Sequence, residues 1–314
     1  MKRFGFLCMM MVIASACNTT DVITISIDDH YRAATDSSSE HWSEVFEYTP
    51  APGQFVGETQ SGGFTGEEST AADAVAYAER RLTAKSFVSL GGFGGYIVVG
   101  FDHSIDNGAG YDLAVRGNAF DGSSEPGVVW VMQDENGDGE PNDTWYELSG
   151  SDTMTESTIR NYSVTYYRPT SAGQPVRWTD SEGGQGEIDY LGDYHKQDYY
   201  YPTWIAADSY TLTGTRLEAR NYDASGVGTL WKQPAYDWGY ADNFSAVDYL
   251  ADNKTTNRLD ISNAIDSRGT TVDLDYIDFV KVQTACNTKS GWLGELSTEV
   301  IDFIDYGLTL KRNE

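Results

Sequence analysis

Ser89-Leu-Gly-Gly-Phe-Gly-Gly-Tyr-Ile-Val-Val-Gly-Phe-Asp-His-Ser104 is the stretch that decides the fold. Four glycines at residues 91, 92, 94 and 95 lead into residues 96–101, a mostly β-branched and aromatic run that predicts a strand. Glycine-rich loops that bind phosphate lead instead into a helix, whose N-terminus holds the anion. These glycines therefore predict close packing of a sheet or a β-bulge rather than a phosphate site.

Similar short runs continue along the rest of the chain, and segments dense in Gly, Asp, Asn and Ser separate them. They lie at residues 87–90, 111–116, 128–132, 162–167, 210–217 and 277–282. This spacing and the 32 glycines predict an all-β fold, an antiparallel two-sheet sandwich that is jelly-roll-like and has long loops. A propeller is disfavoured because no repeat of blade length is present.

One short helix is expected near the N-terminal end of this body. Thr70 and Asp73 have the spacing of a capping box, and residues 71–84 contain neither Gly nor Pro. We expect residues 46–314 to form a single β-sandwich ligand-binding domain. Its long loops are the expected place for a binding site.

The N-terminus has the pattern of an exported lipoprotein. Lys2 and Arg3 precede a short apolar run, and Ala16 precedes Cys17. The run is shorter than the roughly 20 residues that a membrane-spanning helix needs. Residues 1–16 are therefore predicted to be a signal peptide. The junction resembles the lipobox of bacterial lipoproteins, which implies lipidation of Cys17 and a membrane anchor. Residues 17–45 are expected to be a flexible tether, with an edge strand at 22–27 as the alternative.

The charge balance restricts the partners. The chain has 21 Lys and Arg against 48 Asp and Glu, a net charge of −27. Such a field repels phosphate, so we expect no nucleic-acid partner, and it favours cations. Cys8 leaves with the signal peptide and Cys17 would carry lipid, so only Cys286 remains and no intramolecular disulfide is expected.

Asp134-Glu-Asn-Gly-Asp-Gly-Glu-Pro-Asn-Asp143 has the pattern of a calcium loop. Ca²⁺ takes six to eight oxygen ligands, and oxygen-bearing side chains recur here at every second residue. The twelfth position is Trp145 instead of the glutamate of an EF-hand, so the ion is expected to be structural. An acidic turn without metal is the alternative. The candidate ligands are Asp134, Asn136, Asp138, Glu140, Asn142 and Asp143.

Two loops dense in aromatic residues are candidates for ligand binding. Aromatic rings beside polar side chains make flat surfaces on which a sugar or a large planar ligand stacks. Alternation along a strand would bury some of these rings, so one or two exposed rings from each loop are expected. The candidates are Tyr199, Tyr200, Trp204, Trp231, Trp238 and Tyr240.

Catalytic residues are harder to single out. The histidines at 30, 41, 103 and 195 are scattered, and no pair has the spacing of a zinc site. Asp102-His103-Ser104 has the residue types of a catalytic triad, but neighbours on a strand point to opposite faces. We therefore expect a structural role for this trio and a protein that is not an enzyme.

Four segments, in order, resemble a family of Bacteroides-type cell-surface lipoproteins, some of which carry PKD-like modules. They are residues 89–105, 124–148, 237–243 and 278–295, within a match that spans roughly residues 85–305. The family is similar to accessory lipoproteins of outer-membrane cobalamin uptake. The resemblance implies a lipid-anchored, surface-exposed outer-membrane protein that binds a cobamide and delivers it to a TonB-dependent transporter. A glycan-binding lipoprotein, a glycan-degrading enzyme and a protein-binding surface module are the alternatives.

Overall fold

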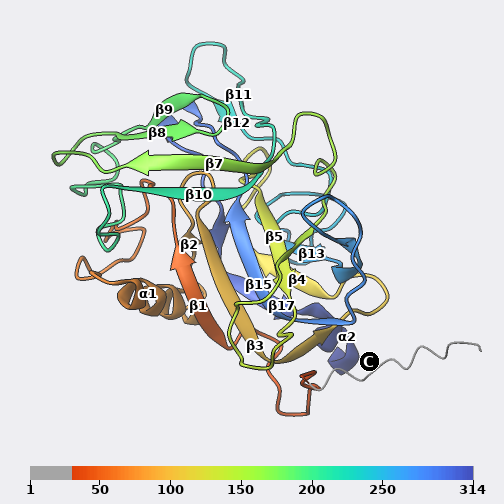
Figure 1. The fold of residues 1–314 in the computed structure, drawn as a ribbon. Helices are drawn as coiled ribbons and strands as arrows, with labels where there is room; N and C mark the ends of the chain where they lie inside the picture. The colour runs from red at the N-terminus through yellow and green to blue at the C-terminus, as the bar shows by residue number, and fades with distance from the viewer. Residues whose placement is uncertain (1–29, 314) are drawn as a thin grey trace, which may run out of the picture.

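The computed structural model describes residues 30–313, which form a mostly β fold (Figure 1). The expected signal peptide and the expected lipidation site Cys17 lie outside these residues, as do residues 17–29 of the expected tether with the alternative edge strand at 22–27. In chain order the elements are β1 (Glu44–Thr49), α1 (Ala71–Thr83), β2 (Val88–Ser89), β3 (Tyr96–Asp106), β4 (Leu113–Arg116), β5 (Gly127–Met132), β6 (Tyr146–Leu148), β7 (Ile159–Tyr167), β8 (Val176–Asp180), β9 (Gln185–Ile188), β10 (Ser209–Arg216), β11 (Tyr222–Asp223), β12 (Trp231–Lys232), β13 (Thr256–Leu259), a 3-10 turn (Ile261–Asn263), β14 (Ala264–Ile265), β15 (Tyr276–Thr284), a 3-10 turn (Gly291–Leu293), β16 (Glu299–Val300), β17 (Asp302–Asp305) and α2 (Tyr306–Asn313).

A six-stranded antiparallel sheet in the order β1-β3-β15-β5-β6-β14 forms the centre of the molecule. Val280 on β15 pairs with Val99 on β3 and with Val131 on β5, so these side chains share one face. All three are fully buried. Because alternate residues of a strand point the same way, this row makes one face of the sheet apolar.

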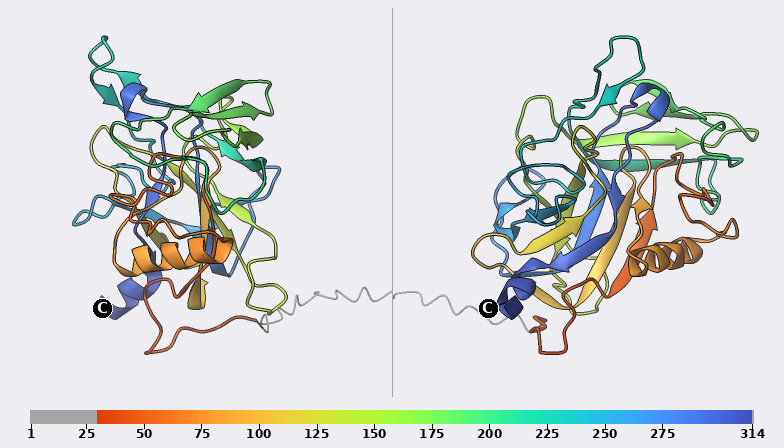
Figure 2. Two further views of the ribbon diagram at one scale, coloured as in Figure 1. Left: turned by 90° about the vertical axis from the view of Figure 1, so that its left-hand side faces the viewer. Right: turned by 180° about the vertical axis from the view of Figure 1, so that it is seen from behind.

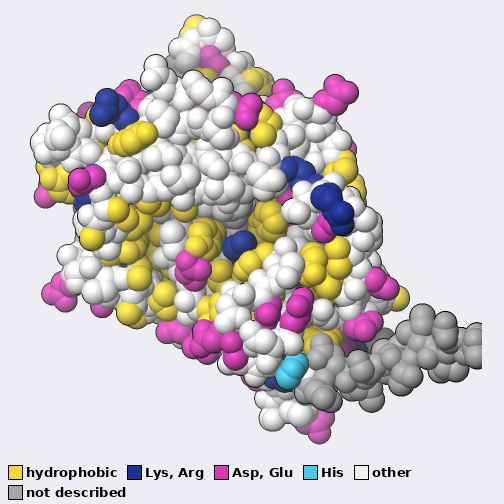
Figure 3. All heavy atoms as spheres, in the orientation of Figure 1, with side chains coloured by type: hydrophobic (Ala, Val, Ile, Leu, Met, Phe, Trp, Pro, Cys, Tyr) yellow, Lys and Arg dark blue, Asp and Glu magenta, His cyan; other side chains and the backbone are white. Residues whose placement is uncertain are grey.

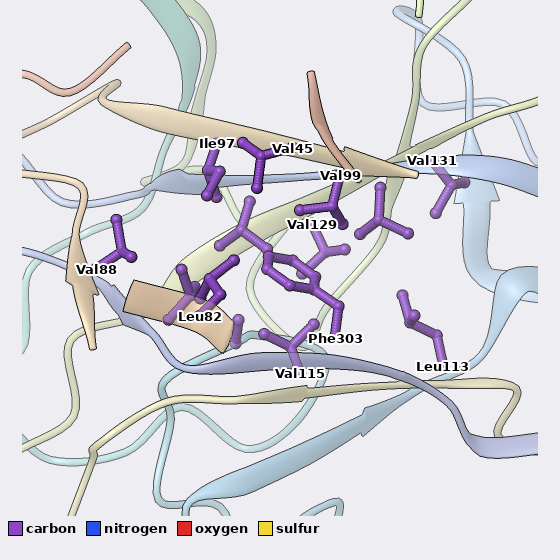
Figure 4. Packing of buried hydrophobic residues seen from close by; sticks show 14 of the residues in the cluster. Val45, Leu82, Val88, Ile97, Val99, Leu113, Val115, Val129, Val131 and Phe303 are labelled. Atoms are coloured by element: carbon purple, nitrogen blue, oxygen red, sulfur yellow. The ribbon is translucent and has the colours of Figure 1, made fainter. Parts of the chain in front are cut away.

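The apolar face packs against a three-stranded sheet in the order β13-β4-β17 (Figure 4). Val115 on β4 and Phe303 on β17 join Val99 and Val129 in one buried cluster. Helix α1 closes the same core with Tyr77 and other apolar side chains. This core holds the ends of β5 and the residues around β16 in fixed positions, and those are the segments that build the candidate site.

The opposite face of the six-stranded sheet is open in part, and hydrophobic side chains gather on it beneath the four-stranded sheet (Figure 3). Lys281 on β15 lies there, with its amine 5.0 Å from the ring centre of Trp130 and 4.6 Å from that of Trp145. Burial lowers the pKa of Lys281 to about 8.

A four-stranded antiparallel sheet in the order β10-β7-β8-β9 lies above this core in Figures 1 and 2. Buried and partly exposed residues alternate along its strands, most clearly along β7. The buried residues form a second cluster with Phe93 and Tyr201. The hairpin β8–β9 is the outer end of this sheet, and it forms one wall of the largest cavity described below.

The expected helix and strands are present. Thr70 caps α1 through the capping box with Asp73, as predicted. Each of the seven predicted runs contains or overlaps a strand. The described residues are 32% strand and 10% helix, and their sheets are antiparallel. The two-sheet sandwich and its jelly-roll-like arrangement stay predictions. Helix α2 and the strands β1, β6, β8, β9, β11, β12, β13, β14, β16 and β17 were not expected from the sequence.

The glycines that open the deciding stretch allow backbone to pack on backbone. Gly91 has a φ of +70°, and a Cβ there would lie 2.0 Å from the carbonyl oxygen of Ala51. A Cβ on Gly95 would lie 1.8 Å from the carbonyl oxygen of Leu90. The expectation that these glycines serve close packing is confirmed.

Residues 30–45, the part of the expected tether that the structure describes, contact the folded domain. Arg32 forms an ion pair with Asp278, with a nitrogen–oxygen distance of 3.0 Å, and Trp42 donates its backbone N–H to Phe303. The folded part therefore begins before residue 46, where the sequence placed the boundary. Within residues 30–313, no helix combines the length and the apolar character that crossing a membrane requires.

Candidate functional site

One cavity is a groove of about 760 Å³, which we call the Trp178 groove. It lies between the β8–β9 hairpin and residues 287–289, which follow β15. Its walls combine two aromatic rings, an aliphatic side chain, amides, hydroxyls and charged groups. The lining residues are Tyr167, Arg177, Trp178, Thr179, Gln185, Gly186, Glu187, Ile188, Asn287, Thr288 and Lys289.

Antiparallel pairing positions the aromatic side chains of this groove. Trp178 pairs with Gly186 across the hairpin, and a Cβ on Gly186 would lie 2.5 Å from the indole ring. Glycine is therefore needed for the ring to lie flat over β9. The hydroxyl groups of Tyr167 and Thr179 form a 2.9 Å hydrogen bond, which fixes the position of the Tyr167 ring. The indole is only partly buried, so part of its surface is open to a ligand.

Two cations border the groove in a chain that is otherwise strongly acidic. Arg177 is exposed, and the described residues include no salt-bridge partner for it. Lys289 lies 2.7 Å from a carboxylate oxygen of Asp189. Glu187, which also lines the groove, is the residue paired with Arg177 across the hairpin.

A second cavity, which we call the acidic pocket, has a volume of about 240 Å³. Residues 292–297, which follow the groove-lining segment 287–289 along the chain, form one side of it. Its lining residues are Gln54, Phe55, Ser123, Glu125, Leu191, Tyr194, His195, Gln233, Trp292, Leu293, Glu295 and Ser297.

Glu295 is the most unusual side chain of the acidic pocket. It is only 4% exposed, and one carboxylate oxygen accepts the backbone N–H of Gln54 at 2.6 Å. The other oxygen, Oε2, is buried without a hydrogen-bond partner. Burial raises the pKa of Glu295 to about 8, and the carboxylate of Glu299 adds to the rise. Most buried polar atoms have a partner, so an orphan oxygen marks a place where a ligand is expected.

Glu125 connects the pocket to a cluster of three acids. Carboxylate oxygens of Glu125, Asp242 and Glu299 all lie within 4.8 Å of one another. Burial and the carboxylate of Glu299 raise the pKa of Glu125 well above its ordinary value, because removing charges from water and placing like charges together both favour the neutral acid. No salt bridge joins any of the three acids to a basic side chain within the described chain.

Asp242 has the most constrained backbone of the cluster. Its φ of +51° lies in the left-handed region. One carboxylate oxygen accepts the backbone N–H groups of Asn118 and Ala119, both at 2.8 Å, and the other accepts that of Glu299 at 2.9 Å. These three donors hold the carboxylate in one orientation between residues 118–119 and the start of β16.

Two exposed rings stand at the mouth of the acidic pocket. Tyr194 is 68% exposed and Trp292 is 50% exposed, and their ring centres are 6.4 Å apart. His195, beside Tyr194, has a buried Nδ1 without a partner, and burial lowers the pKa of this histidine. The pocket thus combines an aromatic rim with a polar interior.

The structure corrects two of the six predicted aromatic ligand residues. Tyr200 and Tyr240 are 0% exposed, so their rings are not available for stacking on a ligand. The hydroxyl of Tyr200 accepts the backbone N–H of Leu191 and donates to the carbonyl of His195. The hydroxyl of Tyr240 accepts the backbone N–H of Asp152 at 3.0 Å. Both rings are core residues that tie loops together through their hydroxyls.

The other four predicted residues do not form one surface. Trp204 stacks on Phe64 of the main core, with ring centres 5.6 Å apart. Trp231 is partly buried, and Trp238 is 36% exposed in a different part of the molecule, beside residues 258–260. Tyr199 is partly exposed. None of the six lines the Trp178 groove or the acidic pocket.

The predicted calcium loop is held by its own side chains. Asp134 is 5% exposed, and its carboxylate accepts the backbone N–H groups of Gly137 and Gly139 at 2.8 and 2.9 Å. Asp138 accepts the amide of Asn142 at 2.9 Å. Calcium binding by residues 134–143, including Asn136, Glu140 and Asp143, stays a prediction.

The trio at residues 102–104 is structural, but for a different reason from the one expected. His103 contacts Asp102 at 2.6 Å and Asp305 at 2.8 Å through its two ring nitrogens. The sheet has a register shift opposite these residues, so neighbouring side chains are not held on opposite faces. Ser104 points to Asp278 at 2.6 Å instead. The expectation that Asp102 and His103 point apart is wrong.

Sequence reasoning missed the acids of the second cavity, although a signal was present. Glu125, Asp242 and Glu295 each lie in one of the segments on which the family resemblance rests. Among 48 acidic residues, nothing in composition or spacing separated them from the rest. Trp178 lies outside those segments and carries no local motif.

No protein-family model matches the chain, and a comparison with curated proteins finds no match either.

Proposed function

We propose that this protein is a non-enzymatic binding protein that captures a cobamide in the Trp178 groove and passes it to a TonB-dependent outer-membrane transporter. The observation that carries the proposal is the groove itself. Its volume of about 760 Å³ lies in the range of ligand sites, and its walls combine rings, amides and cations.

The chemistry of the groove suits such a ligand. A corrinoid presents a broad, mostly uncharged face, on which Trp178 and Tyr167 can stack. Its peripheral amides match the amide side chains of Gln185 and Asn287. Its nucleotide loop carries a phosphate, for which Arg177 and Lys289 supply positive charge. These six residues all line the groove.

Delivery to a transporter needs a ligand that stays accessible. The indole of Trp178 is partly exposed at an outer hairpin of the molecule, so a bound corrinoid would keep one face toward a partner. A lipid on Cys17 and a jelly-roll-like sandwich on the outer surface of the outer membrane complete the proposal. Both come from the sequence and the family resemblance.

Binding is favoured over hydrolysis because burial shifts the pKa values of Glu125 and Glu295 in the same direction. A glycoside hydrolase needs one protonated and one ionised carboxyl group. Burial raises the pKa values of both Glu125 and Glu295. Neither carboxyl group therefore has the low pKa that the ionised member of such a pair needs.

A glycan is the second candidate ligand, and one observation favours it. The exposed rings of Tyr194 and Trp292 flank a polar pocket in the way that sugar-binding aromatic residues do. This site is separate from the Trp178 groove in its lining residues.

Titration calorimetry with three tryptophan variants separates these candidates. The lipid-free chain that starts at Asn18 is titrated with cyanocobalamin, as wild type and as Trp178→Ala, Trp292→Ala and Trp238→Ala. We expect binding that weakens at least ten-fold in Trp178→Ala and is unchanged in the other two. Arg177→Ala tests the same wall without removing a ring. Equal binding by all variants would contradict the placement, and glycan binding lost in Trp292→Ala would support the second candidate.

A further inference from the structure

We propose that a pocket beside Lys281 binds the carboxylate group of a small organic acid, with Lys281 and Arg160 as its cationic partners and the indole rings of Trp130 and Trp145 as its apolar walls. We call it the Lys281 pocket. The inference goes beyond the proposed function and does not depend on it, because this pocket shares no lining residue with the Trp178 groove.

The Lys281 pocket lies where the partly open face of the six-stranded sheet meets the four-stranded sheet. Strands β15 and β5 supply Lys281 and Trp130, and strands β7 and β10 supply Arg160 and residues 213–215. The volume is about 130 Å³. A water molecule in the liquid occupies about 30 Å³, so the pocket has room for a carboxylate group and a few further atoms.

The first argument is the charge of the walls. The chain has 48 acidic residues against 21 basic ones, yet the two ionisable residues that line this pocket, Arg160 and Lys281, are both basic. Within residues 30–313, neither forms a salt bridge. Arg160 donates instead to the backbone carbonyl of Asp266 at 2.7 Å. The pocket therefore carries positive charge that no bound carboxylate of the described chain offsets.

The second argument is the position of the Lys281 amine. It lies 5.0 Å from the ring centre of Trp130 and 4.6 Å from that of Trp145, and both of these residues line the pocket. Lys281 pairs with Val98 and Trp130 on the two neighbouring strands, so no acid stands directly opposite it. Burial lowers the pKa of Lys281 to about 8, because it disfavours the charged amine. A carboxylate beside the amine would offset that cost of burial.

Glu47, on β1, does not take this role. Its carboxylate raises the pKa of Lys281, but by less than burial lowers it, and the two residues form no salt bridge within the described part of the chain. Glu47 already accepts hydrogen bonds from the hydroxyl of Tyr96 and, at 3.2 Å, from that of Thr49. Its carboxylate is therefore held at the edge strand.

Glu147, on β6, does not neutralise the pocket either. It is fully buried, is paired with Trp130 and accepts the hydroxyl of Thr215 at 2.5 Å. Burial raises its pKa, although Thr215 and the positive charge of Arg160 act in the opposite direction. The neutral form of Glu147 is thus favoured, and Arg160 is left to attract an anion from outside the chain.

The walls select an organic acid over an inorganic anion. Phosphate sites typically use the backbone N–H groups of a helix N-terminus, and none of the residues that line this pocket belongs to a helix. The two indole rings instead suit the apolar part of an organic acid, while Lys281 and Arg160 suit its carboxylate. Hydrophobic side chains that gather on this face of the molecule extend the apolar surface (Figure 3).

A purely structural role for Lys281 explains less. Cation–π contacts account for an amine over the rings of Trp130 and Trp145. They do not account for a second cation, Arg160, at the same pocket without a carboxylate partner. A bound carboxylate accounts for both cations together.

The test follows the indole N–H signals of the lipid-free chain by heteronuclear NMR during titration with benzoate at constant ionic strength. Trp130→Phe and Trp145→Phe assign the two signals of the pocket. Benzamide is the matched probe, because it has nearly the same shape as benzoate without its charge. We expect benzoate, and not benzamide, to shift the two signals to saturation.

Substitutions at the two cations locate the anion. Lys281→Met keeps the length of the side chain and removes its charge, and we expect it to weaken benzoate binding at least ten-fold. Arg160→Gln should act in the same direction. Lys232→Met, at an exposed lysine on β12, is the control and should bind benzoate as the wild type does. Circular dichroism checks that the variants fold, and Arg160→Gln serves if Lys281→Met does not.

Four results would overturn the inference. Benzoate may leave the two indole signals unshifted, or benzamide may bind as tightly as benzoate, which would make the pocket an apolar slot. Benzoate affinity may be unchanged in both Lys281→Met and Arg160→Gln. Inorganic phosphate may shift the same signals at lower concentration than benzoate does. None of these results bears on cyanocobalamin binding in the Trp178 groove, so failure here is distinguishable from failure of the proposed function.

Discussion

Asp242 accepts the backbone N–H of Glu299 through a carboxylate oxygen at 2.9 Å. This bond ties the loop before β13 to the start of β16, two segments far apart in the chain. The other oxygen of Asp242 reaches the backbone after β4. The acidic cluster is thus part of the framework that positions both the pocket and the segment that borders the groove.

Asp242→Asn is expected to destabilise the protein. An amide group would place N–H against the backbone N–H of Glu299 or of Asn118 and Ala119, leaving at least one buried donor unsatisfied. Such a loss costs about 1–3 kcal/mol. Urea unfolding in the presence of chelator measures it. The control is Asp237→Asn, at an exposed side chain on the same loop, which should change the free energy of unfolding little.

Gly117→Ala should be destabilising for a steric reason. A Cβ at this position would lie 2.3 Å from a carboxylate oxygen of Asp242 and 2.9 Å from its Cα. Overpacking of this kind costs about 1–3 kcal/mol. Gly307→Ala, in helix α2, is the matched control because its nearest contact would be 3.4 Å. Thermal unfolding of both variants checks the prediction, and an unchanged melting temperature for Gly117→Ala would contradict it.

His103 should make stability depend on pH. Its hydrogen bond to Asp305 is the main cause that raises its pKa, with Asp102 contributing as well. A raised folded-state pKa means that the stabilisation is fully present below the unfolded pKa of about 6.5 and disappears as pH rises through the folded pKa. His103→Gln should therefore be less stable than wild type at pH 5, with a gap that narrows above neutral pH. Denaturant unfolding from pH 5 to 9 measures this gap, and a constant gap would refute the assignment.

Tyr240→Phe should lower stability without affecting ligand binding. The ring is buried, and its hydroxyl accepts the backbone N–H of Asp152. Loss of this hydrogen bond costs about 1 kcal/mol. Chemical unfolding and cyanocobalamin titration on the same preparation provide both readouts. Weaker cyanocobalamin binding at unchanged stability would return Tyr240 to the ligand site that the sequence predicted.

Calcium should raise the stability of the wild-type protein by mass action. A ligand at 100 times its dissociation constant adds about 2.7 kcal/mol to the free energy of unfolding. The Asp138→Asn variant should lose most of this gain, because Asp138 is one of the predicted ligands of the calcium loop at residues 134–143. Melting temperatures with and without CaCl₂ measure the effect.

The strands and the first helix were predictable because their signals are local. The capping box at Thr70 and the β-branched run after Gly95 act within a few residues of where they appear. The hairpin β8–β9 gives a weaker signal, since residues 176–188 are mostly polar and gain their fold from pairing with β7. Local patterns therefore found seven strands, and they missed other core strands such as β1 and β17 as well as the hairpin that carries Trp178.

The candidate sites depend on contacts that a local pattern does not contain. Glu125, Asp242 and Glu299 meet because β5, the loop before β13 and β16 come together, which is a matter of topology. Tyr200 and Tyr240 look like exposed loop rings in the sequence, yet loops that fold back on themselves bury them. Aromatic density predicted stacking surfaces, whereas burial decides which rings a ligand can reach.

The most direct test of the central claim is a crystal structure of the lipid-free chain with cyanocobalamin. We expect the corrin ring against Trp178, between the β8–β9 hairpin and residues 287–289, with its phosphate near Arg177. A corrinoid bound elsewhere on the chain, or an empty groove at a saturating concentration of cyanocobalamin, would contradict the account.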